Sequence, residues 1–269
     1  MRSLVILGTF VLLMCLERRR PLRRTVESPV ERTGRNMAMA GLAVVALRLA
    51  EQPVAQRLTA VVERRRWGVV QMAALPHRIE TVVVLLLLDY TLYLWHVLTH
   101  RVPSLWRMHI VHHVDLDLDV STAVRFHAVE LLVSVFWRAA QILCIGVRQP
   151  ALSLWQTLTL LSVLFHHSNV RLPIRVERWL VRVIVTPRMH GIHHSIAEDE
   201  MNSNWSSGLT IWDRLHGTLR LDVPQGAITI GVPAYRAPED IRLSSLLMMP
   251  INEQRGIHHG ARITRTYAQ

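Results

Sequence analysis

The chain has 269 residues, half of them hydrophobic and 19% of them charged, which excludes an intrinsically disordered protein. Its mean hydropathy is +0.22 and its apolar residues lie in long runs, which argues against an ordinary soluble domain. The formal net charge is +11 and every one of the 31 basic residues is arginine; the arginines flank apolar runs, which favours a membrane surface over nucleic acid as the partner.

Five apolar segments follow one another along the chain, at residues 3–16, 37–50, 81–99, 128–147 and 151–165. The first has the length of one short span, and the basic residues after it favour a cytoplasmic C-terminal end. The second is short and bounded by charge, so it either crosses the membrane or lies in the interface. The third is the best candidate span. The last two are joined by three residues, which favours a helical hairpin.

The more polar remainder of the chain predicts a cap on this bundle. Residues 175–185 favour an amphipathic helix on the membrane surface, and residues 228–230 favour a short extended segment. We therefore expect an all-α integral membrane bundle of about four spans with a histidine-rich helical cap on the cytoplasmic side. The chain divides into residues 1–80, with N-terminal membrane or interfacial helices and a linker, residues 81–220, and a C-terminal tail at 221–269.

The two cysteines, Cys15 and Cys144, both lie within apolar runs. Two cysteines in such surroundings do not indicate a disulfide scaffold, so we expect each to be a small buried hydrophobic side chain. The exclusive use of arginine is typical of a GC-rich bacterial genome. We therefore expect the inner membrane of a bacterium as the location, with the histidines facing the cytoplasm.

Histidines are the unusual feature of the composition, at 15 in one chain, and eight of them form three spaced groups. These groups are His96 and His100 (H-x3-H), His109, His112 and His113 (H-x2-H-H), and His190, His193 and His194 (H-x2-H-H). On a helix, each spacing places the imidazoles of a group on one face. Neutral imidazole is a common ligand of zinc, iron and copper. Eight imidazoles exceed the four ligands of one tetrahedral zinc, so they predict an all-histidine centre for two metals. The alternative, core or interfacial histidines without metal, is disfavoured by the repeated spacing.

Two carboxylates and a tyrosine accompany these groups. Asp89, Tyr93, His96 and His100 fall on one stripe of a helix. An acid inside an apolar span is costly unless it has a partner, so Asp89 is a candidate for orienting a liganding imidazole by accepting its second N–H. A structural pair between Asp89 and an arginine is the alternative. Glu130, in the sequence Arg-Phe-His-x2-Glu, is a second candidate for the orienting role.

From residue 89 to residue 217 the sequence resembles the fatty acid hydroxylase and sterol desaturase superfamily. The motifs that carry the resemblance are Asp-x3-Tyr-x2-His-x3-His, Leu-Trp-Arg-x-His-x2-His-His, Arg-Phe-His-x2-Glu, Phe-His-His-Ser-Asn, Thr-Pro-x2-His-x2-His-His-Ser and Trp-Asp-Arg-Leu-x-Gly-Thr. The resemblance implies a membrane-bound oxidoreductase with two irons held by histidines, which uses dioxygen to hydroxylate or desaturate a C–H bond of a sterol-like or fatty acyl lipid. It identifies residues 81–220 as a catalytic domain of this type.

Nine metal ligands follow from the resemblance, position by position. They are His96, His100, His109, His112, His113, His167, His190, His193 and His194. The other six histidines are not assigned as ligands. His127 and His166 are expected beside the ligands, and His216 stands where the family often has phenylalanine. Surface positions are expected for His77, His258 and His259.

The sequence contains no Gly-x-Gly-x-x-Gly motif and no haem-attachment cysteine motif. The expected partners are therefore a lipid substrate, dioxygen and an external electron donor, namely a ferredoxin, a cytochrome or a reductase. Trp205-Ser206, Ala128 and Val114 depart from residues common in the family. The change at Trp205-Ser206 leaves open an inactive, lipid-binding family member. A histidine-rich membrane metal carrier is a third interpretation, disfavoured because the histidines gather at helix ends.

Overall fold

The computed structural model describes residues 2–255, and His258 and His259 lie outside them. The described chain forms helices and no strand. The helices are α1 (Arg2–Arg19), α2 (Pro29–Ala46), α3 (Gln52–Arg65), α4 (Val69–Met72), α5 (His77–Arg101), α6 (Pro103–His113), α7 (Ala128–Gln141), α8 (Gln149–His167), α9 (Ile174–Leu180), α10 (Pro187–His193), α11 (Glu198–Met201), α12 (Ile211–Leu215) and α13 (Leu243–Met248). The π-helical turns η1 (Leu47–Glu51) and η3 (Ile142–Gly146) extend α2 and α7, and the 3-10 turns are η2 (Thr122–Val124) and η4 (Gln225–Ala227).

Three helical stretches of the described chain are long and apolar enough to cross a membrane: Pro29–Met72, His77–Arg101 and Ala128–Gly146. The all-α membrane bundle predicted from the sequence is thus confirmed. The second apolar segment belongs to the longest of these stretches. The first and last apolar segments form α1 and α8, which are not among the three.

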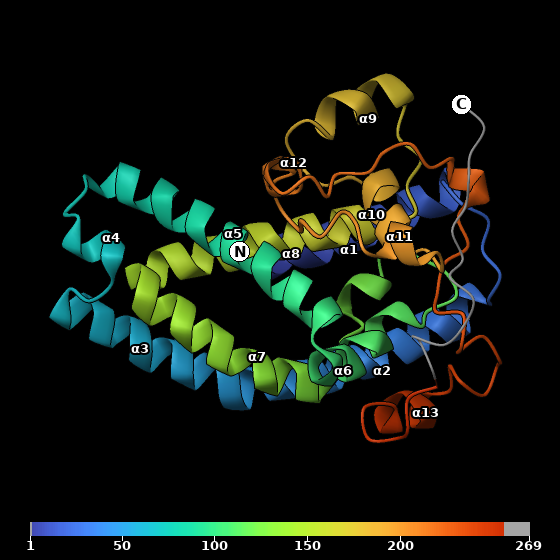
Figure 1. The fold of residues 1–269 in the computed structure, drawn as a ribbon, viewed down its shortest axis with the longest axis horizontal. Helices are drawn as coiled ribbons and strands as arrows, with labels where there is room; N and C mark the ends of the chain where they lie inside the picture. Colours follow the sequence, from blue (N-terminus) through green and yellow to red (C-terminus); the bar gives the residue numbers. More distant parts are fainter. Residues whose placement is uncertain (1, 256–269) are drawn as a thin grey trace.

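The long helices lie side by side along the long axis of the molecule, and α9 to α13 gather at one end, opposite α4 (Figure 1). The outer faces of the long helices are apolar, with Val82 on α5 and Phe136 on α7 exposed. Such a surface suits lipid rather than water. The predicted histidine-rich helical cap therefore sits at one end of an apolar bundle.

A sharp bend joins α5 to α6. Val102 is extended, with φ −98° and ψ 115°, and Pro103 begins α6, where its missing N–H costs nothing. The Val102 N–H donates to the carbonyl of Leu98, so the bend is closed on α5 itself. This places the C-terminal half of α5 against α6, and with it the first two groups of histidines.

The chain reverses direction between η3 and α8, as the three-residue connection predicts. The two helices then diverge, because α8 packs along α1 and α5 rather than along α7. At this end of the bundle two backbones touch. A Cβ atom on Gly68 would lie 2.3 Å from the Cα of Gly146, and both glycines have positive φ, so only glycine fits there.

Three local expectations are modified by the structure. Cys15 and Cys144 are exposed, so the prediction that they are buried was wrong; both lie on the apolar outer surface of their helices. The amphipathic helix expected at 175–185 is the shorter α9, which ends at Leu180. The expected extended segment at 228–230 is reduced to a single bridge between Ile230 and Ser195.

Buried charges attach the loop after α6 to α2. Arg32 on α2 donates from Nε to the Asp115 carboxylate at 3.0 Å and also contacts Asp119, and the side chains of Arg32 and Asp115 are 1% and 0% exposed. Arg125 donates to Asn36 at 2.8 Å and to the carbonyl of Val111 on α6 at 2.8 Å. Arg125 therefore joins α2 to the helix that carries three of the candidate ligands.

We expect Arg32→Met to destabilise the protein by about 3–5 kcal/mol, because Asp119 would stay buried without its arginine and Asp115 would keep only the longer contacts to Arg125 at 3.6 Å and Arg35 at 4.0 Å. The measurement is thermal unfolding of the detergent-purified protein. Arg220→Met is the control, since Arg220 pairs with Asp199 and Asp222 near the surface, and its removal should cost no more than about 1 kcal/mol. Equal effects of the two substitutions would contradict a structural role for the buried cluster.

Candidate metal centre

Four helices bring the candidate ligands to one end of the bundle. Helix α5 contributes His96 and His100, and α6 contributes the H-x2-H-H group that follows the bend. Helix α8 ends at His167. The periodicity of each segment places its imidazoles on the face that turns inward, as predicted, and all nine predicted ligands lie in this one region.

The second H-x2-H-H group lies on α10 and on His194, which directly follows it. Thr186 precedes this short helix and its side chain accepts a hydrogen bond from the Met189 N–H, while Pro187 begins the first turn. Gly191 lies between the histidines because the buried Arg23 guanidinium packs there; a Cβ at Gly191 would lie 2.2 Å from the Arg23 Nη1. The same guanidinium donates to the carbonyl of Pro187 at 3.2 Å, which attaches α10 to the segment after α1.

Eight imidazoles fall into two neighbouring groups of four. Cluster A consists of His96, His100, His113 and His193, and cluster B consists of His112, His167, His190 and His194. In each cluster, one nitrogen atom from each ring lies within 4.8 Å of the others. The rings of His113 and His194 stack at 4.3 Å between centroids, so the two clusters adjoin. Four convergent imidazoles are sufficient ligands for one metal ion in each cluster.

Backbone carbonyl groups determine which nitrogen of several rings carries the proton. His96 Nδ1 lies 2.7 Å from the carbonyl of Trp205, and His193 Nδ1 lies 2.9 Å from that of Ser203. In cluster B, His112 Nδ1 contacts the carbonyl of Arg125 at 3.2 Å, and His167 Nδ1 contacts that of Val163 at 2.8 Å. A carbonyl only accepts hydrogen bonds, so in each neutral ring the proton is on Nδ1 and the lone pair is on Nε2.

These lone pairs meet one another inside the clusters. His167 Nε2 lies 3.0 Å from His112 Nε2, and the assignment above leaves no hydrogen between them. In cluster A, His193 Nε2 is buried and has no hydrogen-bond partner. Convergent lone pairs without a proton repel each other unless a cation lies among them. The residues therefore fit a metal ion in each cluster.

Protonation is a poor substitute for the metal at this site. Burial lowers the pKa of His167 and of His193 to about 3. Burial, reinforced by neighbouring histidines, also lowers the pKa of His112, His190 and His194 well below the usual value. The rings therefore stay neutral at physiological pH, which is the form that binds metal.

His109 lies beside cluster A rather than within it. Its ring centroid is 5.1 Å from that of His100 and 5.3 Å from that of His96. Its Nδ1 is 2.8 Å from the Glu130 carboxylate, and its buried Nε2 has no partner. Glu130 thus makes the contact with an imidazole that the sequence indicated for it, and it orients the free nitrogen of His109 toward cluster A.

Within residues 2–255, Asp89 makes no hydrogen bond or ion pair to an imidazole or to an arginine, and its partners differ from both expectations. Its Oδ2 accepts from the backbone N–H of Leu209 at 3.0 Å and from the indole N–H of Trp212 at 2.7 Å. A Cβ at Gly208 would lie 2.2 Å from Asp89 Oδ1, so the loop approaches the carboxylate closely. Tyr93 lies 3.2 Å from the Thr218 hydroxyl and does not reach a cluster nitrogen by any hydrogen bond in the described chain. Both residues hold the loop that follows residue 204.

Sequence reasoning missed the partner of His96. The carbonyl of Trp205 is held in place because Asp213 accepts hydrogen bonds from the backbone N–H of Trp205 at 2.9 Å and of Ser206 at 3.0 Å. Thr218 donates to the same carboxylate at 2.6 Å. The Trp-Asp-Arg-Leu-x-Gly-Thr motif contains Asp213 and Thr218. The group that they hold in place is a backbone carbonyl, which a pattern of side chains cannot reveal.

The histidines that were not assigned as ligands have varied surroundings. His166 is buried, with its ring 4.1 Å from that of His190. His127 caps α7 by accepting from the Val129 N–H, so its role is structural. His216 is exposed and stacks on Tyr93 at 5.0 Å.

A family model described as fatty acid hydroxylase matches residues 81–218. The ornithine lipid hydroxylase OlsE of Rhizobium tropici is 31% identical over 157 residues, which are 58% of this chain and 46% of that protein. A cholesterol 25-hydroxylase-like protein of Danio rerio is 29% identical over 141 residues, 51% of this chain and 54% of that protein.

The alkylglycerol monooxygenase of Homo sapiens is 26% identical over 134 residues, which are 50% of this chain and 29% of that protein. The chain thus spans about half the length, or less, of these curated relatives. No solved structure matches the chain.

Protein purified after growth with iron is expected to hold about two metal ions per chain, because each cluster offers four imidazoles to one ion. His193→Ala should reduce occupancy of cluster A, and His190→Ala should reduce that of cluster B. Elemental analysis of the purified proteins provides the measurement. His77→Ala is the matched control, since His77 is exposed far along α5 from both clusters. A full metal content in either cluster variant would contradict the assignment.

Glu130→Gln is expected to weaken metal binding at cluster A by about 10- to 100-fold, because a neutral amide orients His109 less firmly than a carboxylate does. Competition with a chelator measures the affinity. Glu239→Gln, at a surface position, is the control. An unchanged affinity in Glu130→Gln would show that His109 is not a ligand or needs no orientation.

Proposed function

Because the chain belongs to the fatty acid hydroxylase family, within the fatty acid hydroxylase and sterol desaturase superfamily, we propose that it is a membrane oxygenase that hydroxylates a C–H bond of a lipid. The observation that carries the proposal is the pair of adjoining clusters, each with four converging imidazoles, all buried in cluster B and half-buried at His100 in cluster A. Two irons are the metals that we assign to them.

The names of the relatives support a lipid as the substrate, since they describe hydroxylation of an ornithine lipid and of cholesterol, and a monooxygenase for alkylglycerol. All three names also describe insertion of oxygen, which favours hydroxylation over desaturation. The overall reaction consumes one dioxygen, two electrons and two protons, and yields the lipid alcohol and one water. Dioxygen and an external electron donor, a ferredoxin, a cytochrome or a reductase, are therefore the co-reactants.

Bound iron would supply the activation of dioxygen, and the chain's own residues would prepare the place where this happens. The carbonyls of Trp205, Ser203, Arg125 and Val163 keep Nδ1–H groups turned outward and Nε2 lone pairs turned inward. Burial of the imidazoles excludes water and keeps them unprotonated. The apolar outer faces of α5 and α7 are the side from which a lipid chain approaches.

The departure of Trp205-Ser206 from the family pattern does not remove any of these functions. Trp205 contributes its backbone carbonyl to His96, and Ser206 contributes a backbone N–H to Asp213. Every residue type supplies a backbone carbonyl, and every residue type except proline supplies a backbone N–H. This argues for an active enzyme over an inactive lipid-binding member. A metal carrier would not need two adjoining clusters at one end of the bundle.

The orientation that we propose places the clusters on the cytoplasmic side of a bacterial inner membrane. Arginines 18–20 and the buried Arg23 follow the apolar α1 at the same end of the bundle as α10. Basic residues that directly follow an apolar helix are typical of the cytoplasmic side. Arginines 64–66 lie near α4, at the opposite end, and oppose this orientation by the same rule.

Iron-loaded protein, given a reductase system and isotopically labelled dioxygen, is expected to transfer one labelled oxygen atom to a lipid from a panel of acyl lipids, ether lipids and sterols. Mass spectrometry of the extracted lipids detects the product. His100→Ala and His190→Ala should lower the rate by more than about 100-fold, since even changes beside a metal ligand cost 10- to 100-fold.

His77→Ala is expected to keep the wild-type rate. Product that carries oxygen from labelled water instead of labelled dioxygen would overturn the proposed reaction. Turnover that persists in His100→Ala would separate the activity from cluster A.

A further inference from the structure

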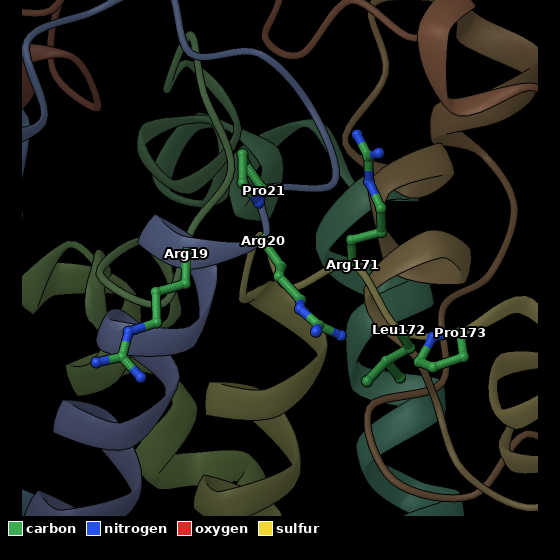
Figure 2. Close-up of a pocket in the computed structure, with 6 residues that line it drawn as sticks. All are labelled: Arg19, Arg20, Pro21, Arg171, Leu172 and Pro173. Atoms are coloured by element: carbon green, nitrogen blue, oxygen red, sulfur yellow. The ribbon is translucent and has the colours of Figure 1, made fainter.

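A basic hollow lies at the end of α1, apart from both metal clusters. The segment after α8 runs beside it, because the Arg171 N–H donates to the carbonyl of Arg20 at 2.8 Å and Pro21 bridges to Val170. Between the two segments is a cavity of about 450 Å³, lined by Arg19, Arg20, Pro21, Arg171, Leu172 and Pro173 (Figure 2). In Figure 2 the Arg20 side chain extends toward Leu172, Arg171 stands on the opposite segment, and Arg19 projects from the other side of the end of α1.

The three arginines are available to a ligand. All are exposed, and within residues 2–255 none of their guanidinium groups makes an ion pair or a hydrogen bond. The acid nearest along the chain, Glu17, is buried and accepts from the backbone N–H groups of Val120 at 3.0 Å and Asn169 at 2.9 Å. Burial, together with the Asp119 carboxylate, raises the pKa of Glu17 to about 7, so it offsets little of the positive charge near neutral pH.

An apolar surface leads up to this hollow along α1. Leu12 and Leu16 are exposed and lie four residues apart, so they share one face of α1 in the turns that lead up to Arg19. Leu172, at the wall of the hollow, packs on the apolar cluster between α1 and α8. A molecule with an anionic head and an apolar tail would find a partner for each part on this face.

The neighbouring α9 has the composition of a helix at a membrane surface. It begins three residues after Arg171, and it exposes Ile174 and Trp179 as well as Arg175 and Arg178. Tryptophan and arginine together are typical of the membrane–water interface. The hollow therefore lies where an apolar, lipid-facing surface changes to a basic one.

We propose that Arg20 and Arg171, with Arg19 at the rim, bind the phosphate of an anionic phospholipid whose acyl chains lie along Leu12 and Leu16 of α1. Arginines at the end of a helix also stabilise its dipole and its membrane orientation, and this would explain Arg19 and Arg20. It does not explain Arg171, which comes from a separate segment and lines the same hollow, with its side chain extending away from Leu172 in Figure 2. Guanidinium groups are the usual protein partners of phosphate. The site needs neither the metals nor the proposed reaction.

The test compares two variants of equal charge. The double variant Arg20→Gln/Arg171→Gln removes two arginines of the hollow, and Arg64→Gln/Arg65→Gln removes two exposed arginines at the other end of the bundle. The full chain, purified in a neutral detergent, is titrated with phosphatidylglycerol, with phosphatidylcholine and with inorganic phosphate, and binding is measured by native mass spectrometry. Metal content and Tm are measured on the same preparations.

Wild type and the Arg64/Arg65 variant are expected to bind one phosphatidylglycerol in preference to phosphatidylcholine. The Arg20/Arg171 variant should bind it about 30-fold more weakly, with metal content unchanged. Equal loss in both variants would mean that only net charge matters, and would overturn the site. Inorganic phosphate bound as tightly as the lipid would overturn the role of the acyl chains. If the double variant has a lowered Tm, the single variant Arg171→Gln is tested in its place. It is expected to bind phosphatidylglycerol about 5-fold more weakly than wild type, and an unchanged affinity would overturn the site.

Discussion

The arrangement of the clusters depends on backbone carbonyls that accept hydrogen bonds from the Nδ1–H groups of the histidines. Each such contact turns an imidazole so that its Nε2 lone pair faces inward. Because the single ring proton is held on Nδ1, no hydrogen atom lies between two Nε2 atoms that face each other. Between His112 and His167 the nitrogen atoms are 3.0 Å apart without a hydrogen. The fold thus holds together groups that repel each other, which is favourable only when a cation lies between them.

The surrounding residues at this end of the bundle keep those carbonyls in place. Asp213 organises the loop that presents Trp205, and Asp89 anchors the following turn through Leu209 and Trp212. On the other side, the buried Arg125 binds the carbonyl of Val111 and the side chain of Asn36, so the carbonyl that Arg125 presents to His112 is fixed to α2. Buried charges are costly, but here each has hydrogen-bond partners, and Asp213 and Arg125 each hold in place a carbonyl that contacts a candidate ligand.

The clusters lie at one end of an apolar bundle, between an apolar surface and a polar one. The proposed reaction needs both, because its substrate is a lipid and its electron donor is water-soluble. The outer faces of α5 and α7 are apolar, and in the proposed reaction an acyl chain or a sterol would reach the site from this side. The segments after α8 are more polar, and the proposed electron donor would approach from their side. The basic hollow beside α9 lies at the same level, where the apolar surface ends.

The sequence by itself determined which stretches form the long helices and which histidines, as candidate ligands, share a helix face, because the spacings H-x3-H and H-x2-H-H act within a turn or two of one helix. It also indicated the contact between Glu130 and an imidazole. Only the tertiary structure decided how the groups divide into two clusters, why Asp89 holds Trp212 instead of a histidine, and that Cys15 and Cys144 face outward. The reason is that these depend on contacts between residues far apart in the chain. His96 and the carbonyl that orients it are 109 residues apart, and a backbone oxygen has no residue type by which a pattern could reveal it.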